Sequence, residues 1–146
     1  MDSAILRTFA QRVVAAALMA WSAALVAAGG QAPAAAVFTV KQAAAGKVAY
    51  AKSCASCHQP DLSGDSEIPA LAGTAFKEIW GTRSTRDLFD YIAAAMPYGA
   101  ASLTVDEYRA VTAYMLQVNG APAGEAELTA ATAVTISSLL PAPSPR

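Results

Sequence analysis

The chain has 146 residues, which is room for one domain of ordinary size, and its formal net charge is −1 at pH 7. Its ten lysines and arginines form no cluster with interleaved aromatic residues, so the sequence lacks the pattern of a nucleic-acid-binding protein. Hydrophobic residues make up 55% of the chain, but many of them are alanines or belong to the first 36 residues. The composition therefore does not by itself indicate a membrane protein.

The first 36 residues have the three-part layout of a secretory signal. Arg7 and Arg12 supply a positive start, residues 13–28 form an apolar run, and small residues follow up to Ala36. The apolar run of 16 residues is shorter than the ~20 that a membrane-spanning helix needs. We therefore predict a signal peptide over residues 1–36 that is removed after export. An uncleaved membrane anchor is the alternative.

The first predicted helix of the mature chain begins after Thr39. Thr39 and Gln42 match a capping box, in which each side chain satisfies a free backbone N–H group near the other. The helix continues through residues 43–52, where Gly46 and Tyr50 share one face. Glycine inside a helix costs about 0.5–1 kcal/mol relative to alanine. Close approach of a second helix would explain it, and a merely tolerated glycine is the alternative.

Next comes the segment Cys54-Ala55-Ser56-Cys57-His58, which holds the only two cysteines and the only histidine. This spacing is typical of a c-type haem, held by thioether bonds to both sulfurs and by the imidazole on the iron. A thioredoxin-like pair would need a βαβ context, and a structural zinc site would need about four ligands. A disulfide between the two cysteines would close a very small loop and stabilise little. The segment therefore predicts one covalent haem c.

Residues 59–69 carry two prolines, a glycine and three acidic residues with little periodicity, which predicts a loop. The acids Asp61, Asp65 and Glu67 lack the spacing of an EF-hand, so a solvated loop is favoured over a calcium site. A short helix over Ala75 to Trp80 follows in the prediction.

A second N-cap is predicted at Ser84, with Asp87 at the third helical position. The helix behind it has an apolar stripe at three- and four-residue steps, formed by Leu88, Phe89, Ile92 and Met96. Pro97 ends this helix, because proline disfavours helical geometry in the residue before it. Met96 is thus placed at a helix exit. Core packing is the ordinary role of such a methionine, but beside a haem it becomes a candidate iron ligand.

The last long helix is predicted to begin with a capping box formed by Thr104 and Glu107 and to end at Asn119-Gly120. Its apolar face is formed by Tyr108, Val111, Met115 and Val118. Met115 is a rival sulfur ligand. Its place inside an amphipathic helix, which should itself face the N-terminal helix, predicts that Met115 fills the core instead.

Residues 121–146 are rich in alanine, proline, serine and threonine and are predicted to form a C-terminal extension. We expect a loose strap or short helix over residues 125–140 and disorder from Pro141 onward.

From Val37 to Asn119 the chain resembles the class I, single-haem bacterial cytochromes c. The resemblance rests on the cysteine and histidine segment, on Pro69-Ala70-Leu71-Ala72-Gly73 as the family's Pro-x-Leu-x-Gly loop, and on Met96-Pro97. It implies that the Pro69 carbonyl accepts a hydrogen bond from His58 and that Leu71 packs on the haem. It also implies that Trp80 binds a haem propionate and that Met96 is the second axial ligand. Val111 and Tyr114 stand where relatives contact the N-terminal helix.

Among these cytochromes, the chain is most similar to the small ones that accompany quinoprotein (PQQ-dependent) dehydrogenases. This likeness rests on the series Trp80-Gly81, Asp87-Leu88-Phe89, Met96-Pro97 and Asn119-Gly120. It implies a periplasmic one-electron carrier, with a quinoprotein dehydrogenase as donor and an oxidase or another cytochrome as acceptor. Histidine and methionine would fill both axial positions, so electron transfer is predicted rather than catalysis.

We therefore predict an all-α protein with the class I cytochrome c fold, in which four to five helices surround one haem c within residues 37–120. Tyr50, Arg83 and Arg86 are further candidates for contacts with the propionates. Two alternatives stay open. One is a haem protein with an open sixth site for ligand sensing or catalysis, and the other is a tightly bound cytochrome subunit of a dehydrogenase complex.

Overall fold

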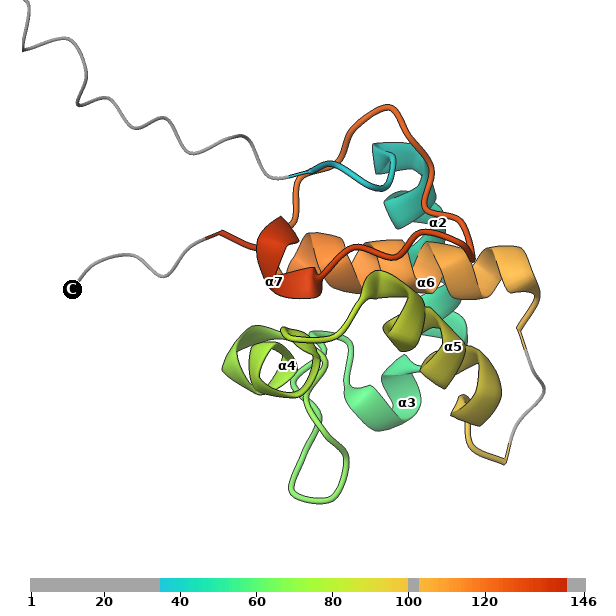
Figure 1. Cartoon of the computed structure of the whole chain (residues 1–146). Helices are drawn as coiled ribbons and strands as arrows, with labels where there is room; N and C mark the ends of the chain where they lie inside the picture. Colours follow the sequence, from blue (N-terminus) through green and yellow to red (C-terminus); the bar gives the residue numbers. More distant parts are fainter. Residues whose placement is uncertain (1–34, 100–102, 142–146) are drawn as a thin grey trace, which may run out of the picture. The chain divides into compact units, whose positions relative to one another are not determined.

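The computed structural model describes residues 35–99 and 103–141, and the predicted signal peptide lies almost entirely outside them. The described part contains six helices and no strand. In chain order they are α2 (Val40–Ser53), α3 (Ala55–His58), α4 (Gly73–Trp80), α5 (Thr85–Ala95), α6 (Val105–Val118) and α7 (Ile136–Leu139) (Figure 1). The all-α prediction is confirmed, and the single-turn helices α3 and α7 bring the number above the four to five expected. None of the described helices is long and apolar enough to cross a membrane.

Helices α2 and α6 cross closely at Gly46 (Figure 1). A Cβ atom added there would lie 1.8 Å from the carbonyl oxygen of Ala110 and 2.9 Å from Cβ of Tyr114. Next to the crossing, the ring centroids of Tyr50 and Tyr114 are 5.5 Å apart. The predicted close approach is confirmed, with Ala110 and Tyr114 as the residues that meet the glycine.

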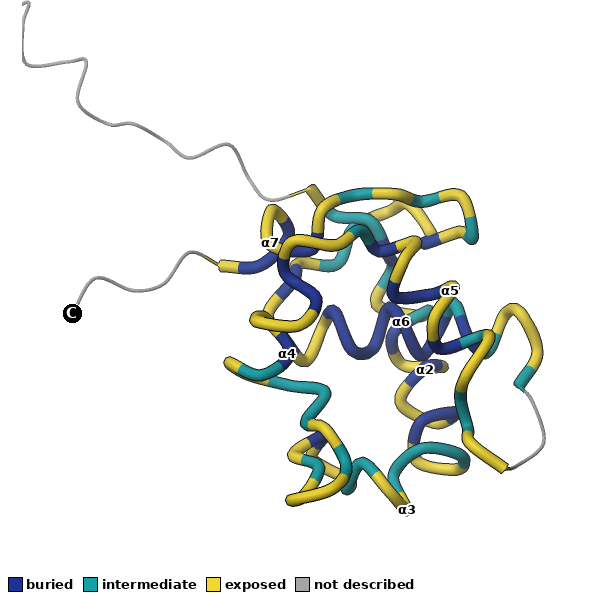
Figure 2. The backbone as a smooth tube through the Cα atoms, turned by 60° about the horizontal axis from the view of Figure 1, so that its bottom comes forward, coloured by how far each residue is buried: buried dark blue, intermediate teal, exposed yellow. Residues whose placement is uncertain are grey.

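Helix α6 forms the centre of the core. Every residue from Ala110 to Leu116 is buried, whereas the other helices expose one face (Figure 2). A helix that is buried on all sides must pack against a neighbour in every direction. Helix α6 therefore contacts α2 and α5 and still presents a face to the cavity described below.

The capping boxes of α5 and α6 are confirmed, but the one predicted for α2 is wrong in part. Asp87 accepts hydrogen bonds from the Ser84 backbone and hydroxyl, which holds the pKa of this carboxyl below its ordinary value. At α2, Thr39 Oγ1 accepts from the Gln42 backbone N–H as expected. The Gln42 side chain instead pairs with both backbone groups of Leu128, each at 2.8 Å. Because the Gln42 side-chain amide is bound to the backbone of Leu128, it does not complete the capping box at Thr39.

Helix α4 begins at Gly73, two residues before the predicted start at Ala75. The N–H groups of a first helical turn have no partner within the helix. The Gly73 N–H is satisfied by Asn119 Oδ1 at 2.9 Å, from the end of α6. The early start thus depends on a residue far along the chain, which local sequence does not indicate.

The C-terminal segment 121–141 packs against the helices (Figure 1). Its buried side chains are Ala121, Leu128, Ile136, Leu139 and Leu140. Thr85 Oγ1 donates to Thr132 O at 2.7 Å and accepts from the Val134 N–H at 3.2 Å. The strap expected over residues 125–140 is present, with α7 inside it, and its buried leucines and hydrogen bonds fix it to the domain. The disorder predicted for the chain end falls mostly on residues 142–146, outside the described part.

Candidate functional site

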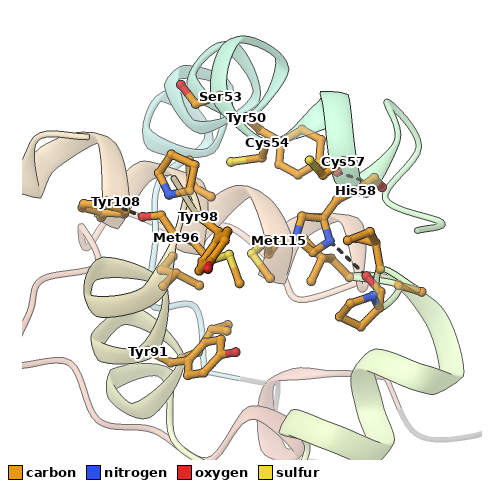
Figure 3. A pocket seen from close by; sticks show the side chains of 18 of the residues that line it. Tyr50, Ser53, Cys54, Cys57, His58, Tyr91, Met96, Tyr98, Tyr108 and Met115 are labelled. Atoms are coloured by element: carbon orange, nitrogen blue, oxygen red, sulfur yellow. Dashed lines mark hydrogen bonds between the residues drawn. The ribbon is translucent and has the colours of Figure 1, made fainter. Parts of the chain in front are cut away.

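A cavity of about 660 Å³ lies between α3, α4, α5 and α6 (Figure 3). All seven predicted cofactor-binding residues line it, namely Cys54, Cys57, His58, Pro69, Leu71, Trp80 and Met96. Its volume is in the range of about 300–1,000 Å³ that is usual for ligand and cofactor pockets. The structure thus brings together residues that are up to 42 positions apart in the sequence.

The two thiols are placed by the junction of α2 and α3. Cys54 caps α2, with its N–H donating to Tyr50 O at 2.8 Å. The backbone N–H groups of Cys57 and His58 then donate to Cys54 O at 3.2 and 3.0 Å, which closes one helical turn. Both cysteines are free, Cys54 half-buried and Cys57 exposed. Burial, and to a lesser extent the neighbouring Cys57, raise the pKa of the Cys54 thiol.

The imidazole of His58 is oriented by Pro69, whose carbonyl oxygen lies 3.0 Å from Nδ1. A carbonyl oxygen can only accept a hydrogen bond, so Nδ1 must carry the proton. In the neutral imidazole Nε2 is then the nitrogen without a proton, and this is the tautomer that can bind a metal through Nε2. The hydrogen bond implied by the resemblance is present, and it fixes the tautomer that ligation requires.

The loop before Pro69 is held in shape by its own acidic residue. Asp65 Oδ1 accepts from the backbone N–H groups of Glu67 and Ile68, both at 2.8 Å, which lowers the pKa of Asp65. Gly64 has φ +63°, and a Cβ there would lie 2.2 Å from Ile68 O. The described residues contain no group of three His, Cys, Asp or Glu side chains placed to hold a metal ion. The two hydrogen bonds that Asp65 accepts stabilise the turn that brings Pro69 to His58.

Met96 lies at the C-terminal end of α5 and is half-buried at the cavity wall (Figure 3). Its backbone N–H donates to Ile92 O at 3.0 Å, which continues the helical pattern by one residue. The predicted position at a helix exit is confirmed. The thioether of Met96 is available to a ligand in the cavity.

Met115 also lines the cavity, so it fills the core on a side of α6 that does not face α2. The helix contacts α2 through Ala110 and Tyr114. Successive helical residues point about 100° apart, so Met115 is turned away from the face that Tyr114 presents to α2. It is only 1% exposed, in keeping with its predicted role in filling the core.

Trp80 lies at the cavity with Arg83 and Tyr91 around its indole ring. The Arg83 guanidinium is 4.9 Å from the ring centroid, and the Tyr91 ring is 5.3 Å from it. Arg86 instead forms an exposed pair with Asp90 at 3.4 Å and does not line the cavity. Of the two candidate arginines, the structure brings only Arg83 to the site.

The hydroxyl of Tyr50 is committed to the backbone, contrary to its predicted role with a propionate. It contacts the carbonyl oxygens of His58 at 3.2 Å and Gln59 at 2.7 Å. A hydroxyl has one proton to donate, and here it is directed at these two acceptors. Burial raises the pKa of Tyr50. The residue therefore links α2 to the end of α3 and supports the backbone of His58.

Asn119 is a structural residue of the site that the sequence suggested only as a helix end. It is 6% exposed, and its Nδ2 donates to Leu71 O at 3.0 Å and Met115 O at 2.8 Å. Its Oδ1 accepts from Gly73, as described above. Asn119 thus joins the loop that carries Leu71 to the end of α6.

The chemistry of the lining fits a haem c. Two thiols lie beside an imidazole with a free Nε2, and a thioether is available from α5. Nitrogen and sulfur ligands of these kinds are the ones that hold haem iron in cytochromes c. Much of the remaining wall is apolar, formed by residues such as Leu71, Leu88, Ile92, Val111 and Met115.

A family model described as "Cytochrome C oxidase, cbb3-type, subunit III" matches residues 41–115. Among solved structures, the sulfane dehydrogenase SoxCD from Paracoccus pantotrophus is similar, with a TM-score of 0.47 and 29% sequence identity. The similarity covers 66% of this chain and 50% of that chain, so this chain corresponds to about half the length of its solved relative. Curated protein sequences gave no match.

Proposed function

The chain belongs to the cytochrome c family whose model is described as subunit III of cbb3-type cytochrome c oxidase, and from this premise we propose that it is a periplasmic one-electron carrier. A cytochrome c domain carries covalently bound haem c, so the chain is an electron-transfer haem protein. The finer assignment, a single-haem carrier that exchanges electrons with other redox proteins, is the proposal. It depends most on the oriented imidazole of His58 in a cavity that also contains Met96.

In this proposal Cys54 and Cys57 would hold the haem through two thioether bonds, and His58 Nε2 and the Met96 thioether would bind its iron. When bound, the haem supplies reversible one-electron exchange at its iron, and ligation by histidine and methionine raises its reduction potential. With both His58 and Met96 bound to it, the iron would have no position for a substrate.

The other residues of the cavity orient and enclose this centre. The Pro69 carbonyl keeps the proton of His58 on Nδ1, which directs Nε2 to the iron. Leu71 and the apolar residues of α5 and α6 exclude water, which favours the less charged state of the centre. We assign Trp80 and Arg83 to the propionates, because they bring a ring N–H donor and a cationic group to one wall.

Covalent attachment is tested by extraction. We expect acid–acetone treatment to leave the haem on the denatured polypeptide, because thioether bonds survive loss of the fold. Replacing Cys54 or Cys57 with serine should lower the yield of holoprotein several-fold. Ser56→Ala, an exposed change between the two cysteines, is the matched control and should leave the yield unchanged. Haem that extracts freely from the wild-type protein would contradict covalent attachment.

We propose a quinoprotein dehydrogenase as electron donor and an oxidase or another cytochrome as acceptor. The sequence resemblance to the small cytochromes of such dehydrogenases supports the donor, and the oxidase named in the family description supports the acceptor class. Near the cavity, Cys57 is exposed and Tyr98 is 94% exposed. Electron-transfer partners commonly use small, weak interfaces of less than about 1,200 Å². We therefore expect transient contact with redox partners at the edge of the cavity near Cys57 and Tyr98.

The donor is tested by mixing the oxidised protein with a purified quinoprotein dehydrogenase and its substrate in a stopped-flow spectrometer. We expect reduction in a bimolecular step, whose observed rate rises in proportion to the dehydrogenase concentration. Ascorbate serves as the chemical control. If ascorbate reduces the protein but no such dehydrogenase does, the assignment of the donor is refuted, whereas the assignment as a one-electron carrier stands. Co-elution with the dehydrogenase on gel filtration would favour the subunit alternative.

A further inference from the structure

We propose that Tyr108 positions Met96, through a hydroxyl group that fixes the backbone carbonyl of this residue. The inference rests on the proposed function, because it takes Met96 as the distal ligand. It assigns a role to a residue that the sequence pattern placed only on the apolar face of α6.

The hydroxyl of Tyr108 links the end of α5 to the segment just before the start of α6. It donates to Met96 O and accepts from the Leu103 N–H at 3.3 Å (Figure 3). The Met96 N–H already donates to Ile92 O on α5. Both backbone polar groups of Met96 are therefore paired, one with α5 and the other with α6. The backbone from which the thioether extends is held between two helices.

Tyr108 is itself firmly placed. It is 5% exposed and lies in the first turn of α6, where its N–H donates to Thr104 O at 3.0 Å. Its carbonyl accepts from Thr112 Oγ1 at 2.8 Å. A buried tyrosine usually finds a hydrogen-bond partner for its hydroxyl. Here the donor and the acceptor capacity of that hydroxyl are both used by the backbone around the methionine.

This arrangement bears on ligation because methionine is a flexible side chain with three rotatable bonds. Fixing its backbone reduces the freedom that the side chain must lose when the sulfur binds. Without the hydroxyl, the Met96 carbonyl must turn to water, and departure of the sulfur from the iron becomes easier. An added ligand that competes with the sulfur should then bind more tightly.

The test is Tyr108→Phe in the oxidised holoprotein, titrated with imidazole at fixed pH. We expect the affinity for imidazole to rise about two- to tenfold, the range that corresponds to loss of one neutral hydrogen bond. The far-red absorption band that reports sulfur–iron coordination in the oxidised protein should weaken at lower imidazole concentrations in Tyr108→Phe than in the wild-type protein.

Two control variants separate positioning from general stability. Thr112→Val removes the buried hydrogen bond from Thr112 Oγ1 to the Tyr108 carbonyl, and Tyr114→Phe removes the hydroxyl of another buried tyrosine of α6. Both should keep the wild-type affinity for imidazole, even where urea unfolding shows a loss of stability. The inference is overturned if Tyr108→Phe binds imidazole with the wild-type affinity. It is also overturned if Thr112→Val raises the imidazole affinity as much as Tyr108→Phe does. If Met96→Ala retains the sulfur–iron band, both the ligand assignment and the inference are overturned. If Met96→Ala loses the band but Tyr108→Phe keeps the wild-type affinity for imidazole, only the inference is overturned.

Discussion

Replacing Met96 with alanine is expected to abolish the sulfur–iron band of the oxidised protein and to lower its reduction potential by about 0.2 V, within the ~0.8 V over which axial ligands set haem potentials. The thioether favours the reduced iron, and its loss leaves the position to water. His58 is the only histidine, so the chain has no second imidazole to replace the sulfur. The far-red absorption spectrum and a spectroelectrochemical titration measure both effects.

Met115→Leu is the matched control, because it removes the other sulfur that lines the cavity while keeping a similar volume. It should retain the sulfur–iron band and change the potential little. Loss of the band in Met115→Leu, with retention in Met96→Ala, would make Met115 the ligand. Absence of the band in the wild-type protein would favour the alternative of an open sixth site.

Replacing Gly46 with alanine is expected to destabilise the holoprotein by about 2–3 kcal/mol, as overpacking of a tight core does. The added Cβ would lie 1.8 Å from the oxygen and 2.3 Å from the carbon of the Ala110 carbonyl. These are backbone atoms of a buried helix, so they cannot rotate away as a flexible side chain would. Helices α2 and α6 would have to separate, and their packing next to Tyr50 and Tyr114 would loosen.

The sign of this change discriminates between the two interpretations of Gly46. If Gly46 were merely tolerated, its change to alanine would raise the free energy of unfolding by about 0.5–1 kcal/mol, because alanine reduces the conformational freedom of the unfolded chain. Ala44→Gly on the exposed side of α2 is the control and should cost about that amount without any clash. Urea unfolding of the three holoproteins gives the free energies of unfolding. A stabilised Gly46→Ala variant would contradict the close crossing.

The sequence by itself determined the features that depend on near neighbours. The caps at Ser84 and Thr104 each close within three residues, through Asp87 and Glu107. The haem segment is complete within five residues, which is why haem c was predicted from it alone. Met96 was placed at a helix exit because proline acts on the residue directly before it.

The tertiary structure alone decided which distant groups these elements meet. The Gln42 side chain left its local cap for Leu128, 86 residues away. Asn119 reached Leu71 and Gly73 rather than only ending a helix. A local pattern shows which side of a helix is apolar, but not which neighbour covers each part of that side.

Helix α6 and the haem cavity show the physical reason. Residues 110–116 of α6 are buried on all sides, so the apolar pattern alone did not show that Met115 lines the cavity. The hydroxyls of Tyr50 and Tyr108 gave no local sign of their acceptors, since a buried polar group bonds whichever partner the packing brings to it. Such pairs form only when helices from different parts of the chain enclose the cavity.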